Sequence, residues 1–227
     1  MSGDWRSPLY PVELPSRKIV VNVTWSCPTF AVPTPGVPDV AAAFRQEGLR
    51  RILDFGAGKL RNTLFLLSLR RGFRVWAVEF EDCFQTKVGK ARLAEARRHK
   101  GFFLKKWPYE FLHSRFEVDA VLLVNVANVV PHESERKRIV AECTRRLRKG
   151  GRLLWMSQYG EPYYKPGVTR RLQSSDGGWF YNLGKEFQTY YREFSIAEIR
   201  SHFDSRRYRE IGKVSAPHHH AFLFEKL

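Results

Sequence analysis

One stretch of the sequence, residues 51–81, constrains the fold more than any other. It reads RILDFGAGKLRNTLFLLSLRRGFRVWAVEFE. A short apolar run ends in Asp54, a turn with two glycines follows, and an apolar segment with helical period comes next. A second apolar run ends in Glu79. Strand, glycine turn, helix and strand in this order predict a βαβ unit of a parallel sheet.

The two glycines of the turn, Gly56 and Gly58, point to a ligand. A nucleotide-type ligand must approach the backbone where the first strand turns into the helix, and a side chain there would obstruct it. Glu79 follows Gly58 by about 20 residues, a distance that suits a carboxylate accepting hydrogen bonds from ribose hydroxyls. A tight turn beside an incidental acid would explain the same residues. Because strands flank the turn on both sides, we favour an adenosine-containing cofactor.

The neighbours of the glycines discriminate between cofactors. The dinucleotide pattern GxGxxG has a third glycine, where this chain has Arg61. Asp54 would repel a pyrophosphate but suits a ligand that carries an ammonium group. The run LDFGAG with Glu79 resembles the first motif and the ribose-binding acid of the class I S-adenosylmethionine-dependent methyltransferases. An NAD-dependent oxidoreductase is the weaker alternative.

The resemblance extends from about residue 39 to the C-terminus. KGGRLL, after a predicted helix over 133–149 that Gly150–Gly151 would end, resembles the join before the fifth strand in that family. Segments 208–215 and 221–226 predict a closing antiparallel hairpin. The resemblance implies one α/β domain over 39–227, with a Rossmann-like, seven-stranded, mostly parallel sheet. It also implies S-adenosylmethionine as the cofactor and methyl transfer as the reaction.

The resemblance also assigns cofactor contacts residue by residue. It implies that Asp54, Gly56, Gly58 and Glu79 hold the cofactor. Asn62, at the start of the helix after the glycine turn, is a further candidate.

Two more candidates follow later strands. Trp107 comes after the strand predicted at 102–104, where the family usually has an acid near the adenine. We expect Trp107 either to stack on the adenine or to lie in the core. Asn125 ends the buried strand predicted at 119–124, and ligand chemistry sits at such strand ends in open α/β sheets. It is the expected residue near the transferred methyl group, and a turn asparagine is the alternative. If a base is required, His113, His132 and Tyr164 are candidates.

Residues 1–38 form a Pro-rich N-terminal arm, in which 18–25 is a possible edge strand. After the arm, Asp39 is the expected cap of a helix over 40–47. Proline removes backbone donors, so we expect mostly extended or irregular chain. We favour a structural wrap around the sheet edge over a flap above the cofactor site. The arm holds seven of the chain's 12 prolines: Pro8, Pro11, Pro15, Pro28, Pro33, Pro35 and Pro38.

A second unusual stretch is the insertion at about 158–194, where aromatic residues alternate with cations and several glycines predict a loop-like chain. Such a composition suits base stacking with phosphate contacts, an aromatic small molecule, or a lid with its own small core. The basic segment 87–100 is either a phosphate-binding helix or a solvated face.

The formal net charge of +16 favours an anionic partner. We therefore expect a methyltransferase that acts on RNA or DNA. A methyltransferase of small molecules and a non-catalytic, methyltransferase-like binding subunit are the alternatives. The sequence does not indicate the oligomeric state.

The cysteines and the hydropathy bear on the compartment. Cys27, Cys83 and Cys143 are far apart and lack CxxC spacing, which argues against a disulfide framework or a zinc site. The histidines at 218–220 are expected in the loop of the closing hairpin rather than in a metal site, so no metal is expected. Without a run of 18 apolar residues, we expect no membrane partner and a cytoplasmic protein.

Overall fold

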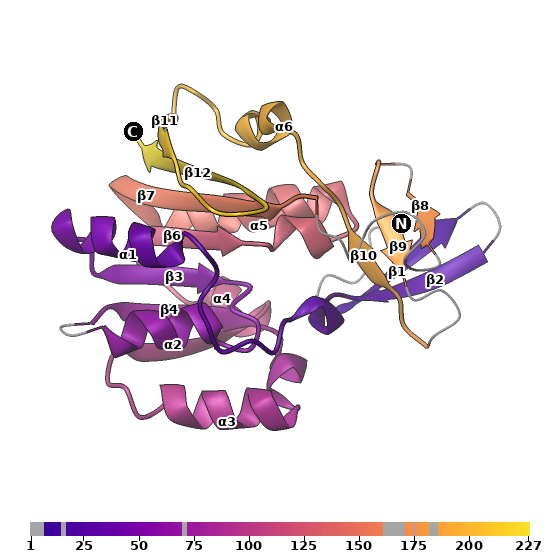
Figure 1. Cartoon of the computed structure of the whole chain (residues 1–227), viewed down its shortest axis with the longest axis horizontal. Coiled ribbons are helices and arrows are strands. Elements are labelled where there is room, and N and C mark those ends of the chain that lie inside the picture. The colour runs from indigo at the N-terminus through magenta and orange to yellow at the C-terminus, as the bar shows by residue number, and fades with distance from the viewer. Residues whose placement is uncertain (1–6, 15–16, 70–71, 161–170, 175, 182–185) are drawn as a thin grey trace.

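The computed structural model of the 227-residue chain describes residues 7–14, 17–69, 72–160, 171–174, 176–181 and 186–227. Its main sheet has seven strands in the order β11-β12-β7-β6-β3-β4-β5 (Figure 1). β12 pairs antiparallel with both β7 and β11, and the remaining pairs are parallel. The predicted Rossmann-like, mostly parallel sheet with a closing antiparallel hairpin is confirmed. The strands are β3 (Arg51–Phe55), β4 (Arg74–Glu79), β5 (Phe102–Lys106), β6 (Val118–Val124), β7 (Leu147–Gln158), β11 (Tyr208–Lys213) and β12 (His219–Lys226).

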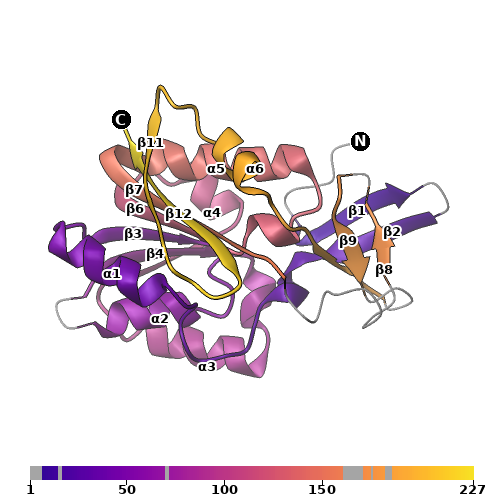
Figure 2. The ribbon, with the colours of Figure 1, turned by 45° about the horizontal axis from the view of Figure 1, so that its top comes forward.

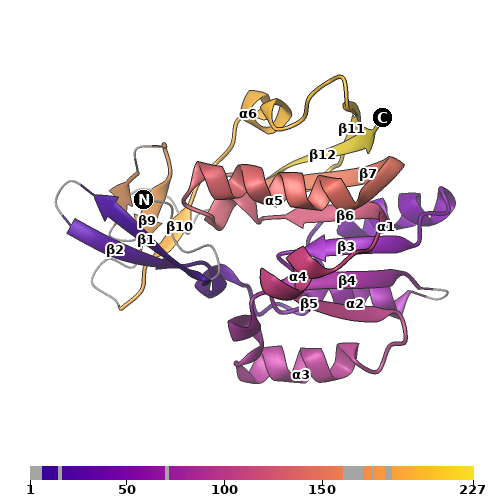
Figure 3. The same ribbon diagram turned by 180° about the vertical axis from the view of Figure 1, so that it is seen from behind.

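Helices cover both faces of this sheet, as Figures 1 and 3 show from opposite sides. α1 (Val37–Gln46), α2 (Arg61–Ser68) and α3 (Lys87–Ala96) cover one face, and α4 (Tyr109–His113) and α5 (Glu133–Arg146) cover the other. β6 is buried along its whole length, as a parallel strand between two helix layers must be. Short 3-10 helices are η1 (Val23–Ser26), η2 (Glu81–Phe84) and η3 (Ala127–Val129).

Two predicted boundaries around β7 and β12 were wrong. α5 ends at Arg146 rather than 149, and Gly150–Gly151 lie inside β7 instead of ending the helix. The reason is Leu147, which is buried against the core and extends the chain to pair with β6. His219 and His220 belong to β12 rather than to the hairpin loop, because they pair with the end of β7.

The start of α1 also differs from the prediction. Asp39 lies within the first turn, and the N-cap is Gly36, with a φ of 86°. Pro38 explains the earlier start, since its fixed φ suits the first turn of a helix. By contrast, the predicted capping box at Ser195 and Glu198 is present and begins α6 (Ile196–Ser201).

A second, smaller unit lies beyond the carboxyl ends of the parallel strands (Figures 1 and 2). We call it the cap. It joins the hairpin β1 (Leu9–Leu14) and β2 (Arg17–Asn22) to a three-stranded sheet of order β10-β9-β8. An isolated bridge between Val21 and Gln188 connects the two parts. These three strands, β8 (Arg171–Gln173), β9 (Trp179–Tyr181) and β10 (Thr189–Tyr191), come from the insertion that was predicted to be loop-like.

The insertion forms strands because its aromatic residues supply a core. Phe180 and Tyr190 are fully buried, and their ring centroids lie 5.3 Å apart across β9 and β10. Aromatic cross-strand pairs of this kind stabilise a sheet. Across the described ranges, none of the helices has the length and apolar character needed to span a membrane.

Candidate functional site

A cavity of 630 Å³ lies where the carboxyl ends of β3, β4 and β6 meet the N-terminal arm and the cap. This volume falls within the range of about 300–1,000 Å³ that is typical of ligand pockets. Six of the seven predicted site residues line it: Gly56, Gly58, Asn62, Glu79, Trp107 and Asn125. The seventh, Asp54, lies behind the cavity wall.

Glu79 is the last residue of β4 and is held in a fixed orientation by backbone donors. Its Oε2 accepts a hydrogen bond from the Gly58 N–H at 2.7 Å, and its Oε1 accepts one from the Phe80 N–H at 2.8 Å. Burial raises the pKa of Glu79 to about 7, although both hydrogen bonds favour the carboxylate. Each oxygen can accept a further bond. The carboxyl group is therefore fixed at the cavity wall, and its contact with hydroxyl groups of a ligand stays a prediction.

Gly56 and Gly58 both adopt left-handed backbone angles, with φ of 65° and 55°. A Cβ on Gly56 would lie 2.6 Å from Val126 Cγ2, and one on Gly58 would lie 3.5 Å from Cys27 Sγ. The sequence argument gave ligand approach as the reason for these glycines. For Gly56 the structure adds a second reason, because the loop after β6 packs directly against the turn, whereas the distance at Gly58 is an ordinary contact.

Asp54 is 1% exposed and hydrogen-bonded inside the protein. The Thr63 hydroxyl donates to Asp54 Oδ2 at 2.6 Å. Burial raises the pKa of Asp54 to about 6, and this bond and the nearby Arg61 oppose the rise. In the structure, Asp54 stabilises the first turn of α2 through its hydrogen bond with Thr63. Its contact with a ligand ammonium group stays a prediction.

Asn62 belongs to a set of side chains that hold the arm against the sheet. Asn62 Oδ1 accepts the Thr34 N–H at 2.9 Å, and Lys59 Nζ donates to the Cys27 carbonyl at 3.1 Å. Arg92 of α3 donates to the Thr29 carbonyl at 2.7 Å. Arm residues between 26 and 35 consequently form part of the cavity wall. This is the flap position, which the sequence analysis had considered but not favoured.

Trp107 lies in the core, one of its two expected places, and also borders the cavity. Its ring packs edge-on against Phe55, with centroids 5.0 Å apart, and lies 5.7 Å from the Phe111 ring. It is 6% exposed and also lines the cavity. Core packing fixes the ring, while stacking on an adenine stays a prediction.

Asn125 follows β6 in a left-handed conformation, with φ of 58°. Its Nδ2 lies 3.2 Å from His219 Nε2, and His219 Nδ1 lies 2.6 Å from the Pro217 carbonyl oxygen. Because a carbonyl can only accept, Nδ1 carries the proton and Nε2 accepts from the Asn125 amide. Asn125 Oδ1 is buried and has no hydrogen-bond partner among the described residues.

The structure describes two of the three candidate bases, His113 and His132, and both contact backbone carbonyls. His113 is bonded to the Tyr109 carbonyl at 2.7 Å, and His132 to the Pro11 carbonyl at 3.3 Å. Neither is among the residues that line the cavity. Tyr164 lies outside the described residues.

Two cavity residues, His219 and Arg61, were missed as site residues by the sequence analysis. His219 was assigned to a loop, and only the pairing of His219 with Gln158 across β12 and β7 brings it beside Asn125. Arg61 was considered only as the residue in place of a third glycine. It lines the cavity at the first position of α2, where burial lowers its pKa.

The basic segment predicted at 87–100 lies apart from the cavity. Its exposed cations include Lys87, Lys90, Arg97 and Arg98, and none of these lines the cavity. Arg92 is bound to the arm instead. Cavity and basic helix are therefore separate features of the surface.

Neither a protein-family model nor a curated protein matches this sequence. Solved structures with the same fold do match. An S-adenosylmethionine-dependent methyltransferase from Clostridium acetobutylicum ATCC 824 is 12% identical with a TM-score of 0.57, and the match covers 84% of this chain and 90% of that one. An amino pentose methyltransferase from Micromonospora echinaspora with bound S-adenosylmethionine is 18% identical with a TM-score of 0.56, at 84% and 90% coverage.

A third similar structure is mitomycin 7-O-methyltransferase, at 13% identity and a TM-score of 0.57. The match covers 85% of this chain but 53% of that one, so this chain spans about half the length of that enzyme. At these identities the likeness establishes a fold shared with methyltransferases.

Proposed function

We propose that the chain is an S-adenosylmethionine-dependent methyltransferase whose acceptor is a small molecule. The observation that carries the proposal is one cavity in which Glu79 and Asn125, at the ends of β4 and β6, flank the glycine turn of β3. In doubly wound sheets, ligands bind at the carboxyl ends of the strands. The shared fold of the methyltransferases above supports this choice of cofactor.

The residues of the cavity fit S-adenosylmethionine. When bound, it supplies a methyl group on a sulfonium, which a nucleophile can displace. Glu79 would accept the ribose hydroxyls, because its carboxylate is fixed at the cavity wall by Gly58 and Phe80. Arg61 is a cation at the start of α2, where it would pair with the carboxylate of the cofactor. Trp107 would cover the adenine.

The acceptor side is built from the loop after β6 and from the cap. Asn125 and His219 form a hydrogen-bonded pair there. The rings of Tyr10 in β1 and Tyr191 in β10 line the same part of the cavity. The unsatisfied Asn125 Oδ1 would accept an N–H or O–H of the substrate. Aligning the nucleophile in this way can supply much of the rate without a strong base.

A small acceptor is favoured over the nucleic acid that the net charge suggested. The cavity is walled by arm and cap, and the exposed cations of α3 lie elsewhere. Two of the similar structures are named for small acceptors, mitomycin and an amino pentose. The net charge of +16 and the aromatic and basic composition of the insertion remain in favour of RNA or DNA.

The test is transfer of a labelled methyl group from S-adenosylmethionine to two sets of acceptors. One set holds aromatic hydroxyl compounds and amino sugars, and the other holds RNA and DNA at two salt concentrations. We expect label in a member of the first set. Labelled RNA or DNA, with a yield that falls steeply as salt rises, would overturn the small acceptor but keep the cofactor. Failure to bind S-adenosylmethionine would favour a non-catalytic subunit.

A further inference from the structure

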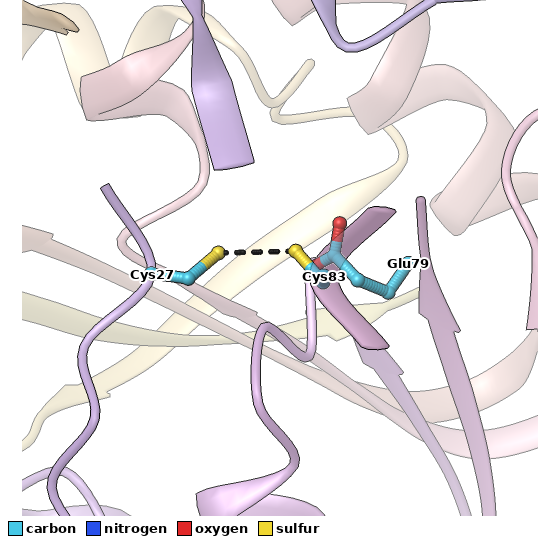
Figure 4. Close-up of side chains that lie close together, drawn as sticks. All are labelled: Cys27, Glu79 and Cys83. Carbon is cyan, nitrogen blue, oxygen red and sulfur yellow. Dashed lines mark hydrogen bonds between the residues drawn. The ribbon is translucent and has the colours of Figure 1, made fainter. Parts of the chain in front are cut away.

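Two of the three cysteines, remote in sequence, lie in contact beside the cavity (Figure 4). The Sγ atoms of Cys27 and Cys83 are 3.4 Å apart. Cys27 is in the N-terminal arm, directly after η1, and Cys83 is in η2, directly after β4. The sequence analysis expected no disulfide because the cysteines lack close spacing. The fold removes that objection, because it brings arm and sheet together at this point.

The two thiols differ in access. Cys27 is half-buried and lines the cavity, so a small solute can reach its sulfur. Cys83 is 2% exposed. The hydrogen bond to Cys27 and burial both raise the pKa of the Cys83 thiol. Cys27 is therefore the residue that a dissolved oxidant meets first, and Cys83 is placed to react with it afterwards.

A carboxylate completes the group. The two sulfur atoms and a carboxylate oxygen of Glu79 all lie within 4.8 Å of one another. Glu79 also hydrogen-bonds the Cys83 side chain. A base is thus in reach of the buried thiol, which must lose its proton before its sulfur can attack.

We propose that Cys27 and Cys83 form a reversible disulfide on exposure to peroxide, and that this bond fastens the arm over the cofactor cavity. The bond itself follows from the geometry of the two sulfurs. Only its effect on the cofactor rests on the proposed function.

The reaction needs two steps and one molecule of hydrogen peroxide. The Cys27 thiol releases its proton, the thiolate sulfur attacks a peroxide oxygen and the O–O bond breaks, so that Cys27 becomes a sulfenic acid and the leaving hydroxide takes up the released proton as one water. Cys83 then passes its proton to Glu79, and its sulfur attacks Cys27 Sγ. The S–S bond forms as the S–O bond breaks, and the sulfenic hydroxyl takes up a proton and leaves as a second water. Two thiols lose two electrons to the peroxide.

The position of the bond explains its expected effect. In the reduced protein, side-chain hydrogen bonds hold the arm: Asn62 of α2 accepts the Thr34 N–H, Lys59 of the glycine turn donates to the Cys27 carbonyl, and Arg92 of α3 donates to the Thr29 carbonyl. Such contacts open locally at small cost. A disulfide at Cys27 would hold one end of the cavity wall to η2, beside Glu79. A ligand in the cavity would then exchange more slowly.

The experiment treats the full-length chain with hydrogen peroxide, alkylates the remaining thiols and identifies the peptides by mass spectrometry. We expect a linked pair of peptides that contain Cys27 and Cys83, one remaining thiol at Cys143, and recovery of all three thiols with dithiothreitol. Cys27→Ser and Cys83→Ser should each abolish the link. Cys143→Ala is the matched control, because Cys143 is buried in α5, and it should link normally.

The second readout is the dissociation rate of S-adenosylmethionine from oxidised and reduced protein. We expect oxidation to slow release by roughly tenfold or more, since release would require the arm to open. Linkage without any binding of S-adenosylmethionine in either state would sink the proposed function and leave the disulfide standing. Irreversible oxidation of Cys27 without linkage would overturn the disulfide. Co-purification of one zinc ion that protects both thiols would also overturn it.

Discussion

The sheet side and the cap side of the cavity are built in different ways. The sheet side comes from one continuous segment, β3 to β4, in which Gly56, Gly58 and Glu79 lie close in sequence. The cap side joins β2 near the N-terminus to β10, for example through the Val20 N–H and Gln188 Oε1, which are 168 residues apart in sequence and 3.1 Å apart in space. Under the proposed function, a local motif provides the cofactor half and tertiary packing provides the acceptor half.

An ion pair between a buried arginine and a half-buried aspartate lies at the junction between the two sides. Arg136 of α5 is 1% exposed, and it donates to Asp176 Oδ2 at 2.9 Å and to the Val130 carbonyl at 2.8 Å. Asp176 also accepts the Tyr190 hydroxyl of β10 at 2.8 Å. The Arg136 guanidinium thus connects the cap to α5, and the contact of His132 with the Pro11 carbonyl is a second connection.

The largest effect on the sheet side is expected from Gly56→Ala. The left-handed φ and the 2.6 Å approach to Val126 Cγ2 should together lower the free energy of unfolding by about 4 kcal/mol. Gly48→Ala is the matched control, since φ is 74° there but no atom lies within 4 Å, and it should cost about 1 kcal/mol. Chemical denaturation measures both. Equal losses would show that the turn does not pack against the loop after β6.

On the cap side, Asp176→Asn should lower the free energy of unfolding by about 3 kcal/mol, because it leaves the buried Arg136 charge without its partner. Asp204→Asn, in an exposed pair with Arg206, should leave stability unchanged. Calorimetric melting compares the two variants. A loss in Asp176→Asn no greater than in the control would mean that this junction does not hold the cap.

Asn125→Gly separates the two halves by function. Glycine tolerates the left-handed backbone at this position, so the variant removes the amide without adding strain. We expect kcat to fall by about tenfold to hundredfold, the effect of about 1.4–2.8 kcal/mol in the transition state. The affinity for S-adenosylmethionine should remain unchanged. Loss of cofactor affinity would place Asn125 in the cofactor half of the cavity instead of the acceptor half. A double variant with His219→Gln should be non-additive if the pair acts as a unit.

The last effect concerns pH and the carboxyl group of Glu79. The pKa of Glu79 is about 7 in the folded chain against an ordinary value of 4.5, so the folded state keeps this proton longer than the unfolded state does. Its contribution to stability is complete below pH 4.5 and is lost as pH rises to 7, at about 1 kcal/mol per pH unit within that window. The pKa of Asp54 is also raised, to about 6, so its ionisation likewise lowers the free energy of unfolding as pH rises. Glu79→Gln should flatten this part of the profile, and an unchanged slope would contradict the shift.

The sequence was informative where the determinants are local. Alternating strands and helices predicted the sheet, and the glycine turn and Glu79, which were predicted to face one ligand, line the same cavity. The insertion was predicted less well, because Phe180 and Tyr190 stabilise strands only after they meet in space. His219 and the contact of Cys27 with Cys83 depend on pairings between distant segments, which no local pattern records.

The most direct measurement is a calorimetric titration with S-adenosylmethionine at pH 8, where most of the Glu79 carboxyl is ionised. Wild type, Glu79→Gln and Glu81→Gln are compared, since Glu81 is an exposed neighbour paired with Lys106. The account predicts micromolar binding by wild type and by Glu81→Gln, and binding about 30-fold weaker in Glu79→Gln, the loss of a charge-assisted hydrogen bond. Equal binding by wild type and both variants, or no binding by wild type, would contradict the account.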